Sequence, residues 1–469
     1  VENPDGSITV PAKVSLAATE GGSVKFTASN LTINGSVSAP GGSLSFAASN
    51  LPLSTINTTA VTRVRPTPVA GRGNFVLGNG AKLSAAGLLV DDRATGSDLL
   101  PVNLQGGSIA ISGFNVRLER DSLVDVSGGA QIGTRGRVTY GNGGSLAINA
   151  GKDLTIAEAF GGQLFLGGRL KGYSGARGAS MSLSALAFQI GGKSAPASVT
   201  RLDPGFFSTG GFSSFSLSGM GLPSGTPGVQ VVAGTELRPV AESYIAVPNP
   251  VAGSGADLVR VLKPEGLRTP VSLSFQATGL TDSFNSGFPI SRGDVVVGRG
   301  ATIATDALGN VSLRGETVAV YGRVVAPGGN ITVAGASAFP LATEAQATVY
   351  LAPGSVLNAR GTSVIREGRN GWREGFVTGG GTVSVSGNIV AEAGSVINVA
   401  GATGVLDQSR TYRNPNATPI TGLRGQEYVP VRYETNGGTV TLAGSQMLCS
   451  DATLYGPGGG DSAVGGTLN

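Results

Sequence analysis

Two neighbouring stretches of the chain are near copies of each other. Residues 21–33 read GGSVKFTASNLTI and residues 41–53 read GGSLSFAASNLPL, so that eight of thirteen positions are identical at an offset of twenty residues. Self-similarity at a short, fixed period is typical of repeat architectures, in which each unit packs against its neighbours instead of folding alone. We therefore expect an array of stacked units.

The beginning of this unit recurs along the whole chain. A glycine pair is followed by a small polar residue and then by alternating apolar and polar or small residues. The copies are GGSIAI at 106–111, GGSLAI at 143–148, GGNITV at 328–333, GGTVSV at 380–385 and GGTVTL at 437–442. Alternation with a period of two predicts short strands with one buried face. In the first two units the side chains expected to point inward are Val24, Phe26, Leu31, Ile33, Leu44 and Phe46, while Lys25, Thr32 and Ser45 should point outward.

The composition favours the same fold class. Glycine supplies 77 of the 469 residues, and only 13% of residues are charged, against about 25% in ordinary globular domains. Each glycine inside a helix costs about 1 kcal/mol relative to alanine, which argues against long helices. Hydrophobic residues make up 40% of the chain, which is too many for a disordered protein. Short strands in units of about twenty residues therefore predict an all-β protein built as a parallel β-helix.

Two asparagines occupy equivalent places in the first two units. Asn30 and Asn50 each follow an Ala-Ser step and precede an apolar strand. In a stack of coils, equivalent asparagines can form a ladder of amide hydrogen bonds. The alternative is that both are ordinary turn residues, which need no such partner.

Irregular stretches interrupt the repeat and divide the chain. Residues 1–191 are predicted to form β-helix coils with an insertion near 54–75, and residues 192–270 an irregular excursion rich in Pro, Gly and Ser. Residues 271–469 are predicted to form further coils, with loops rich in arginine and aromatic residues near 359–376 and 406–436. Insertions in a solenoid leave the stack intact and project from one edge.

Several classes of chemistry are excluded by what the chain lacks. There is no histidine and a single cysteine, Cys449, so neither a histidine-based catalytic scheme nor an intrachain disulfide can form.

The formal net charge is +4 without a basic run, which argues against nucleic acid as a partner. The chain begins at Val1 and its last residues repeat the start of the motif, so we expect a segment of a longer polypeptide.

A second sequence motif alternates with the glycine-pair units. YLAPGSVLNARG at 350–361, DSLVDVSGG at 121–129 and GSVINVAG at 394–401 share a serine, apolar residues and an Asp or Asn before a glycine. This alternation resembles the shafts of the filamentous haemagglutinin family of large secreted bacterial exoproteins. The resemblance is distributed over most of the chain outside the irregular stretches.

The resemblance implies a right-handed, single-stranded parallel β-helix that acts as a non-enzymatic, adhesin-like shaft. It also implies two-partner secretion with an outer-membrane secretion partner, and a location at the bacterial outer cell surface or outside the cell. The family's secretion domain carries Asn-Pro-Asn motifs, and Asn414-Pro415-Asn416 lies in the wrong surroundings for that domain. The secretion route thus comes from the resemblance alone.

Paired carboxylates offer the best candidate for catalysis. Parallel β-helices also occur as polysaccharide-degrading enzymes, and Asp91-Asp92-Arg93 follows the apolar run Leu88-Leu89-Val90. Two carboxylates can divide the acid and base roles of such an enzyme. However, adjacent strand residues point to opposite faces and no second acidic pair occurs at a matching position, so a turn at the end of a strand is the preferred interpretation. We expect no catalytic residues, no metal site and no cofactor.

Arginine and aromatic residues gather in the last two irregular stretches. Both residue types are enriched in interface hot spots because they bury a large area and pair in fixed geometry. They predict contacts with a glycan, a cell-surface receptor or a neighbouring shaft. The candidate binding residues are Arg366, Arg369, Trp372, Arg373, Arg410, Tyr412, Arg413, Arg424, Tyr428, Arg432 and Tyr433. In the alternative interpretation the arginines pair with Glu367, Glu374, Glu427 and Glu434 and the aromatic rings cover coil edges.

These features predict a structural shaft that holds binding regions away from the cell surface. A second hypothesis is a subunit of a self-assembling extracellular filament or sheath, since open strand edges promote association. A third, less favoured hypothesis is a β-helical polysaccharide-degrading enzyme that uses the carboxylates of Asp91 and Asp92.

Overall fold

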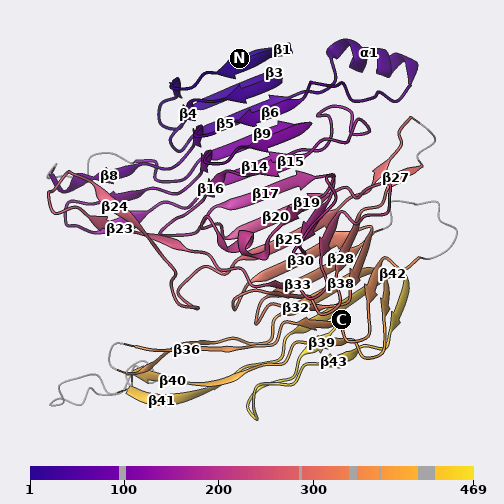
Figure 1. Ribbon diagram of the computed structural model, residues 1–469. Helices are drawn as coiled ribbons and strands as arrows, with labels where there is room; N and C mark the ends of the chain where they lie inside the picture. The colour runs from indigo at the N-terminus through magenta and orange to yellow at the C-terminus, as the bar shows by residue number, and fades with distance from the viewer. Residues whose placement is uncertain (95–101, 285–287, 337–345, 369–370, 410–427) are drawn as a thin grey trace.

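The computed structural model describes residues 1–94, 102–284, 288–336, 346–368, 371–409 and 428–469 of the chain. It is nearly all β, with 48% strand and 4% helix. Short strands run parallel to their equivalents in the coils above and below, so that the chain winds into a stack (Figure 1). The predicted parallel β-helix is therefore confirmed.

The coils contribute strands to three columns. The first two columns merge into one 22-stranded sheet, because the first strand of the chain and three other long strands continue from one column into the next. The first column contains β3 (Ser23–Ile33), β5 (Ser43–Ala48), β9 (Ser108–Gly113), β14 (Ser145–Asn149), β17 (Ser180–Ala185), β20 (Ser214–Gly219), β25 (Ser272–Ala277), β30 (Asn310–Gly315), β33 (Asn330–Gly335), β38 (Thr382–Ala391), β42 (Thr439–Ser450) and β44 (Thr467–Leu468). The second contains the distal halves of β3, β38 and β42 together with β1 (Glu2–Val10), β6 (Asn74–Leu77), β10 (Asn115–Leu118), β15 (Leu164–Leu166), β18 (Phe188–Ile190), β19 (Thr200–Leu202), β21 (Val229–Val231), β28 (Asp294–Val297), β31 (Thr317–Val320) and β34 (Val349–Leu351).

The third column is divided into two separate sheets. The five-stranded sheet contains β2 (Ser15–Ala17), β4 (Ser36–Ser38), β7 (Lys82–Ser84), β11 (Leu123–Asp125) and β16 (Arg169–Lys171). The six-stranded sheet contains β22 (Glu236–Leu237), β29 (Thr302–Ala304), β32 (Arg323–Val325), β35 (Val356–Asn358), β39 (Val396–Asn398) and β43 (Thr453–Tyr455). Between β16 and β22 this column is interrupted.

The alternating pattern places the core as the sequence predicted. Phe26, Leu31, Ile33, Leu44 and Phe46 are buried, and Val24 is partly buried against the same core. Among the residues expected to point outward, Lys25 is exposed, while Thr32 and Ser45 are partly exposed. Equivalent residues lie directly above one another, since β3 and β5 pair with Phe26 opposite Phe46. A single cluster of buried side chains consequently extends from Val10 to Val440.

The second glycine of each pair lies at the corner before the first column, where successive coils come closest. A Cβ atom added to Gly107 would lie 1.9 Å from the carbonyl oxygen of Gly42, in the coil beside it. That oxygen also accepts the N–H of Ser108 at 2.9 Å, so it cannot retreat without weakening the ladder. Equivalent contacts, between 1.8 and 2.0 Å, occur at Gly42, Gly144, Gly329, Gly381 and Gly438. The glycine pair is thus a requirement of coil stacking.

The predicted asparagine ladder exists, but Asn50 is not its member. Asn74 donates its side-chain amide to Asn30 Oδ1 at 2.9 Å, and Asn115 donates to Asn74 Oδ1 at 2.9 Å. Asn50 is fully buried and donates instead to the carbonyl oxygens of Val69 and Arg72. The reason is that the chain leaves the stack after β5 and returns only at β6, so that Asn74 takes the place beside Asn30. The prediction was therefore wrong about the partner.

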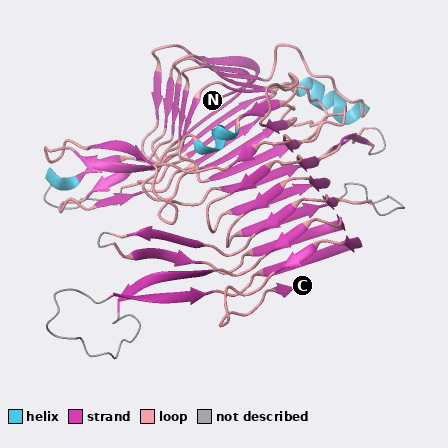
Figure 2. Cartoon of the chain, turned by 60° about the horizontal axis from the view of Figure 1, so that its bottom comes forward, coloured by secondary structure: helices cyan, strands magenta, loops and turns pink. Residues whose placement is uncertain are grey.

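Insertions leave the stack at two corners rather than at one edge, contrary to the sequence prediction (Figures 1 and 2). Between the first and second columns lie helix α1 (Leu53–Thr62), inside the insertion expected near 54–75, and the hairpin of β26 (Leu280–Thr281) and β27 (Pro289–Ser291). Between the third and first columns lie β8 (Leu89–Asp91), the 3₁₀ helix η1 (Asp92–Ala94), β12 (Ala130–Ile132), β13 (Val138–Tyr140) and three long hairpins. These hairpins are formed by β23 (Ser243–Pro248) with β24 (Ala256–Val261), β36 (Ser363–Glu367) with β37 (Arg373–Val377), and β40 (Thr403–Ser409) with β41 (Tyr428–Glu434).

Residues 192–270 are not the single irregular excursion that was predicted. This range holds coil strands, because β20 pairs with β17 on one side and with β25 on the other. Only the β23–β24 hairpin within it projects from the stack. This coil was missed in the sequence because no glycine pair directly precedes β20. The chain reaches β20 through the 3₁₀ helix η2 (Pro204–Ser208) and the segment that follows it.

Candidate functional site

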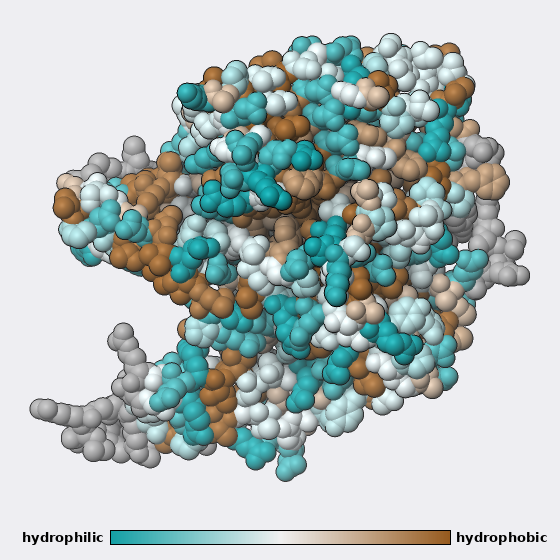
Figure 3. All heavy atoms as spheres, in the orientation of Figure 1, coloured by the Kyte–Doolittle hydropathy of each residue, from teal (hydrophilic) through white to brown (hydrophobic). Residues whose placement is uncertain are grey.

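Two groups of strands project from the corner between the third and first columns (Figures 1 and 2). We call β8, β12, β13, β23 and β24 the upper arm, and β36, β37, β40 and β41 the lower arm. In the space-filling view the surface is indented between the two arms (Figure 3). The lower arm carries the described members of the arginine-aromatic set.

The lower arm brings two predicted aromatic residues together. The ring of Trp372, at the beginning of the β37 side of one hairpin, stacks on the ring of Tyr428 in the other hairpin. Their centroids lie 3.6 Å apart and their planes differ by 20°. Aromatic pairs contribute about 0.5–1.5 kcal/mol beyond the area that they bury. The stack therefore joins two hairpins through residues that lie fifty-six positions apart in the sequence.

An ion pair joins the same two hairpins. The Arg373 guanidinium donates to both carboxylate oxygens of Asp407, at 2.8 and 3.2 Å, and the Arg373 backbone N–H donates to the same carboxylate at 2.8 Å. The hydrogen bond from Arg373 lowers the pKa of Asp407, and the carboxylate in turn raises the pKa of Arg373. A bidentate pair holds two planar groups in one orientation. It positions the lower arm as one unit.

Other candidate arginines pair within their own hairpin. Arg366 contacts Glu374 at 3.4 Å, and Arg432 contacts Glu434 at 2.9 Å. The alternative interpretation, in which glutamates neutralise the arginines, thus holds for these two. Tyr433 lies on β41 opposite Gly404 and is half-buried. Arg369, Arg410, Tyr412, Arg413 and Arg424 lie outside the described residues.

The lower arm still presents charge and aromatic surface to the solvent. The side chain of Arg432 is 65% exposed and that of Arg373 is 47% exposed. Trp372 and Tyr428 are each half-buried. This combination matches the composition of interface hot spots, which pair aromatic area with directional arginine hydrogen bonds. The arrangement is suited to contact with a surface.

The upper arm was missed by the sequence analysis as a possible contact surface. Its β23–β24 hairpin exposes Ile245, Val247, Leu258 and Val259, and the projection that includes this hairpin carries hydrophobic, brown surface in Figure 3. The alternating run SYIAVP at 243–248, followed by Gly and Ser residues and then ADLVRV at 256–261, is a hairpin signal that could have revealed it.

The carboxylates of Asp91 and Asp92 have structural partners. Asp91 accepts three hydrogen bonds from Arg93, one from its backbone N–H and two from its guanidinium, and also the backbone N–H groups of Gly253 at 2.9 Å and Gly255 at 3.1 Å. Asp92 is buried and accepts a hydrogen bond from Gln131 at 2.6 Å. Since β8 ends at Asp91 and η1 begins at Asp92, the interpretation as a turn at the end of a strand is confirmed. Asp91 fastens the loop of the β23–β24 hairpin to β8.

Acid is expected to release this attachment. The hydrogen bond from Arg93 holds the pKa of Asp91 far below its ordinary value of 3.8. A depressed pKa stabilises the folded state fully above the unfolded-state pKa, and this contribution is lost progressively as pH falls from the unfolded-state pKa of Asp91 towards its much lower folded-state pKa. Pepsin digestion should therefore leave the loop between Asn249 and Gly255 intact at pH 4 and cleave it faster at pH 2. Asp91→Asn should raise cleavage already at pH 4.

A matched control is Asp257→Asn, which removes an exposed carboxylate from the same hairpin. It should leave loop cleavage unchanged at both values of pH. Equal loop cleavage of the wild type and Asp91→Asn at pH 4 would show that this carboxylate does not hold the loop.

Comparisons with known proteins identify no relative. No protein-family model matches the chain, and neither a curated protein nor a solved structure does. Among the described residues, no helix has the length and apolarity needed to cross a bilayer. In the same part of the chain, no cluster of three or more Cys, Asp or Glu side chains is arranged to hold a metal ion.

Proposed function

We propose that this chain is a structural shaft segment of a large secreted bacterial adhesin-like exoprotein. The observation that carries the proposal is the unbroken core from Val10 to Val440, combined with arms that leave only at the corners. A stack of coils joined by ladder hydrogen bonds resists bending, because each coil is held by both neighbours. Its role is to hold contact surfaces at a distance from the cell.

The lower arm is proposed to supply one such contact surface. The Trp372–Tyr428 stack and the Arg373–Asp407 pair order two hairpins before any partner arrives. Preordered side chains lose less entropy on binding, so more of the contact energy becomes affinity. A glycan or a cell-surface receptor would meet exposed arginine and half-buried aromatic rings there.

Export by a two-partner system belongs to the same proposal. It rests on the resemblance of the alternating motifs, for example GSVINVAG at 394–401, to those of the filamentous haemagglutinin family. Co-expression with an outer-membrane secretion partner should deliver the chain, joined to such a family's secretion domain, to the medium or cell surface. Retention in the periplasm in the presence of a functional partner would oppose this route.

Electron microscopy of the purified chain tests the shaft. Single, stiff particles of uniform width are expected, because one continuous core runs through the stack. Flexible strings of separate globules would contradict the proposal. Regular fibres would instead favour the second hypothesis, a self-assembling filament.

Substitution in the lower arm tests the contact surface. Beads coated with the chain are expected to adhere to epithelial cell monolayers, and Trp372→Ala should weaken this adherence at least about tenfold, as for a hot-spot aromatic. The melting temperature should hardly change, because the arm lies outside the coil core. Tyr455→Ala, which removes a ring that is 54% exposed outside the arms, is the control. Equal adherence of both variants and the wild type would exclude a role of Trp372 in contact.

A further inference from the structure

The interruption of the third column leaves an opening in the wall of the stack. β16 is the last strand of the five-stranded sheet, and β22 is the first strand of the six-stranded sheet. In the coil between them the chain forms the 3₁₀ helix η2 instead of a strand. A cavity of about 570 Å³ lies at this place, which is within the range of about 300–1,000 Å³ that small-molecule sites occupy. We call this cavity the window.

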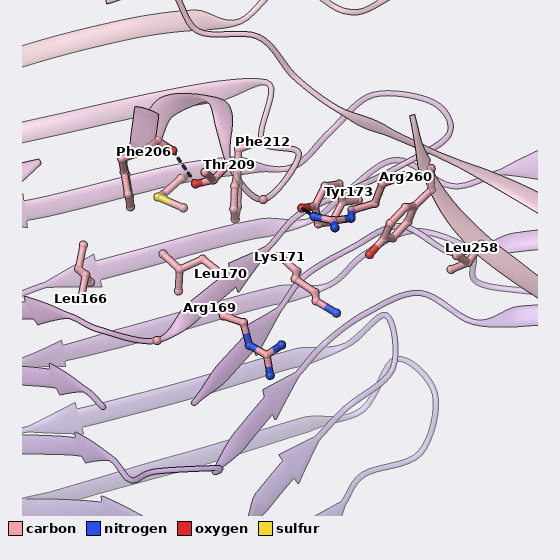
Figure 4. A pocket seen from close by; sticks show the side chains of 14 residues that line it. Leu166, Arg169, Leu170, Lys171, Tyr173, Phe206, Thr209, Phe212, Leu258 and Arg260 are labelled. Atoms are coloured by element: carbon pink, nitrogen blue, oxygen red, sulfur yellow. Dashed lines mark hydrogen bonds between the residues drawn. The ribbon is translucent and has the colours of Figure 1, made fainter. Parts of the chain in front are cut away.

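The floor of the window is apolar and reaches the core. Met181 points inward from β17 in the first column and is 3% exposed, and Phe212 is 1% exposed. Leu170 and Phe206, both partly buried, complete the floor. Figure 4 shows Phe206 and Phe212 entering from the η2 segment toward Leu170. An apolar group in the window would therefore leave water for a surface of side chains that already belong to the core.

The rim of the window is cationic. Arg169 and Lys171 alternate with Leu170 on β16, so both point to the outer face of the sheet, and Arg260 approaches from β24. No Asp, Glu, Asn or Gln side chain lines the window. Within the described part of the chain neither Arg169 nor Lys171 has an ion-pair partner, and Arg260 has only Glu242, at 3.9 Å.

The third cation, Arg260, contacts one tyrosine of a stacked pair. Tyr173 and Tyr244 stack with centroids 4.6 Å apart, and Arg260 donates to the Tyr173 hydroxyl at 3.4 Å. Burial, more than any other cause, raises the pKa of Tyr244 to about 12. Its hydroxyl consequently stays protonated at neutral pH and adds no negative charge to the rim. The charges of Asp125, which lies opposite Lys171 on the neighbouring strand, and of Glu242 also raise this pKa, but neither carboxylate lines the window.

We propose that the window binds small amphipathic carboxylates, with the acid group at Arg169, Lys171 and Arg260 and the apolar body over Met181, Phe206 and Phe212. Guanidinium and ammonium groups form their strongest hydrogen bonds with carboxylates. A neutral sugar fits less well, because its many hydroxyl donors would find no side-chain amide or carboxylate acceptor there. An acyl chain of about eight carbons has no hydroxyl groups and therefore needs no hydrogen-bond acceptors there.

Calorimetric titration of the intact chain with octanoate, at low ionic strength, tests this site. Octanoate should bind at one site, whereas 1-octanol, which lacks the charge, and glucuronate, which lacks the apolar tail, should each bind at least about tenfold more weakly. The double substitution Arg169→Gln, Lys171→Gln should lower octanoate affinity at least about tenfold. Arg260→Gln, on a different element, should lower it as well.

The control is Arg323→Gln, which removes an exposed arginine from β32 of the same column outside the window. It should leave octanoate affinity unchanged. The proposal is overturned if octanoate does not bind, if glucuronate or 1-octanol binds equally well, or if the control substitution weakens binding as much as the window substitutions. Since Arg169, Lys171 and Arg260 lie on the rim of the window and Arg323 is an exposed residue of β32, unchanged melting temperatures are expected for every variant.

Discussion

Replacing Phe215 by alanine is expected to lower the free energy of unfolding by about 3–5 kcal/mol, the range for deleting a buried phenylalanine. Phe215 is 1% exposed, and its ring lies 5.1 Å from the ring of Phe207 and 5.9 Å from that of Phe212. These rings fill the interior of the coil that lacks a strand in the third column. Removing the central ring leaves a cavity that the surrounding coils cannot close.

Urea denaturation followed by far-ultraviolet circular dichroism measures this effect. Because contacts in a coil stack are between nearest neighbours, a weakened coil in the middle of the stack is also expected to separate the unfolding of the two halves into distinct transitions. Phe288→Ala is the control, since that ring is 64% exposed and its loss should cost no more than about 0.5 kcal/mol. A Phe215→Ala protein as stable as the control would show that the aromatic cluster does not replace the missing strand.

Gly107→Ala is expected to destabilise the stack by about 3 kcal/mol, at the upper end of the usual cost of overpacking. The added methyl group would lie 1.9 Å from the Gly42 carbonyl oxygen. Relief requires the two coils to move apart, and that movement stretches the Ser108 N–H hydrogen bond to the same oxygen. Unlike a clash with a flexible side chain, this one involves backbone on both sides.

The matched control for this substitution is Gly465→Ala. Gly465 does not have a positive φ, and a Cβ atom there would find its nearest neighbour at 3.6 Å, an ordinary contact. Thermal unfolding of both variants should show a lowered melting temperature for Gly107→Ala alone. Equal melting temperatures would mean that the glycine corner is not a requirement of stacking.

The columns of the stack could be predicted from local patterns. Period-two alternation such as that of Leu44 and Phe46 reports directly which side chains face the core, since a strand has only two faces. The glycine pair, as at Gly41 and Gly42, marks the corner, because only glycine allows the close approach found there. The alternation and the glycine pair each involve residues that are close together in the chain, so both can be recognised in the sequence.

The candidate site was less accessible to the same reasoning. The sequence indicated a gathering of arginine and aromatic residues, and the described ones do lie on one arm. The partner of Arg373 was not foreseen, because Asp407 lies thirty-four residues away in another hairpin. No local pattern records which residues of two separate insertions will meet.

The sequence by itself determined the parallel coil stack, its inward side chains and its glycine corners, because these follow from strand periodicity and from the space that one residue occupies. Only the tertiary structure decided that Asn74 rather than Asn50 lies beside Asn30. It alone decided that the arms share one corner and that the third column opens between β16 and β22. Those features depend on where the chain returns after an insertion, and the return point is set by packing between residues far apart in the sequence.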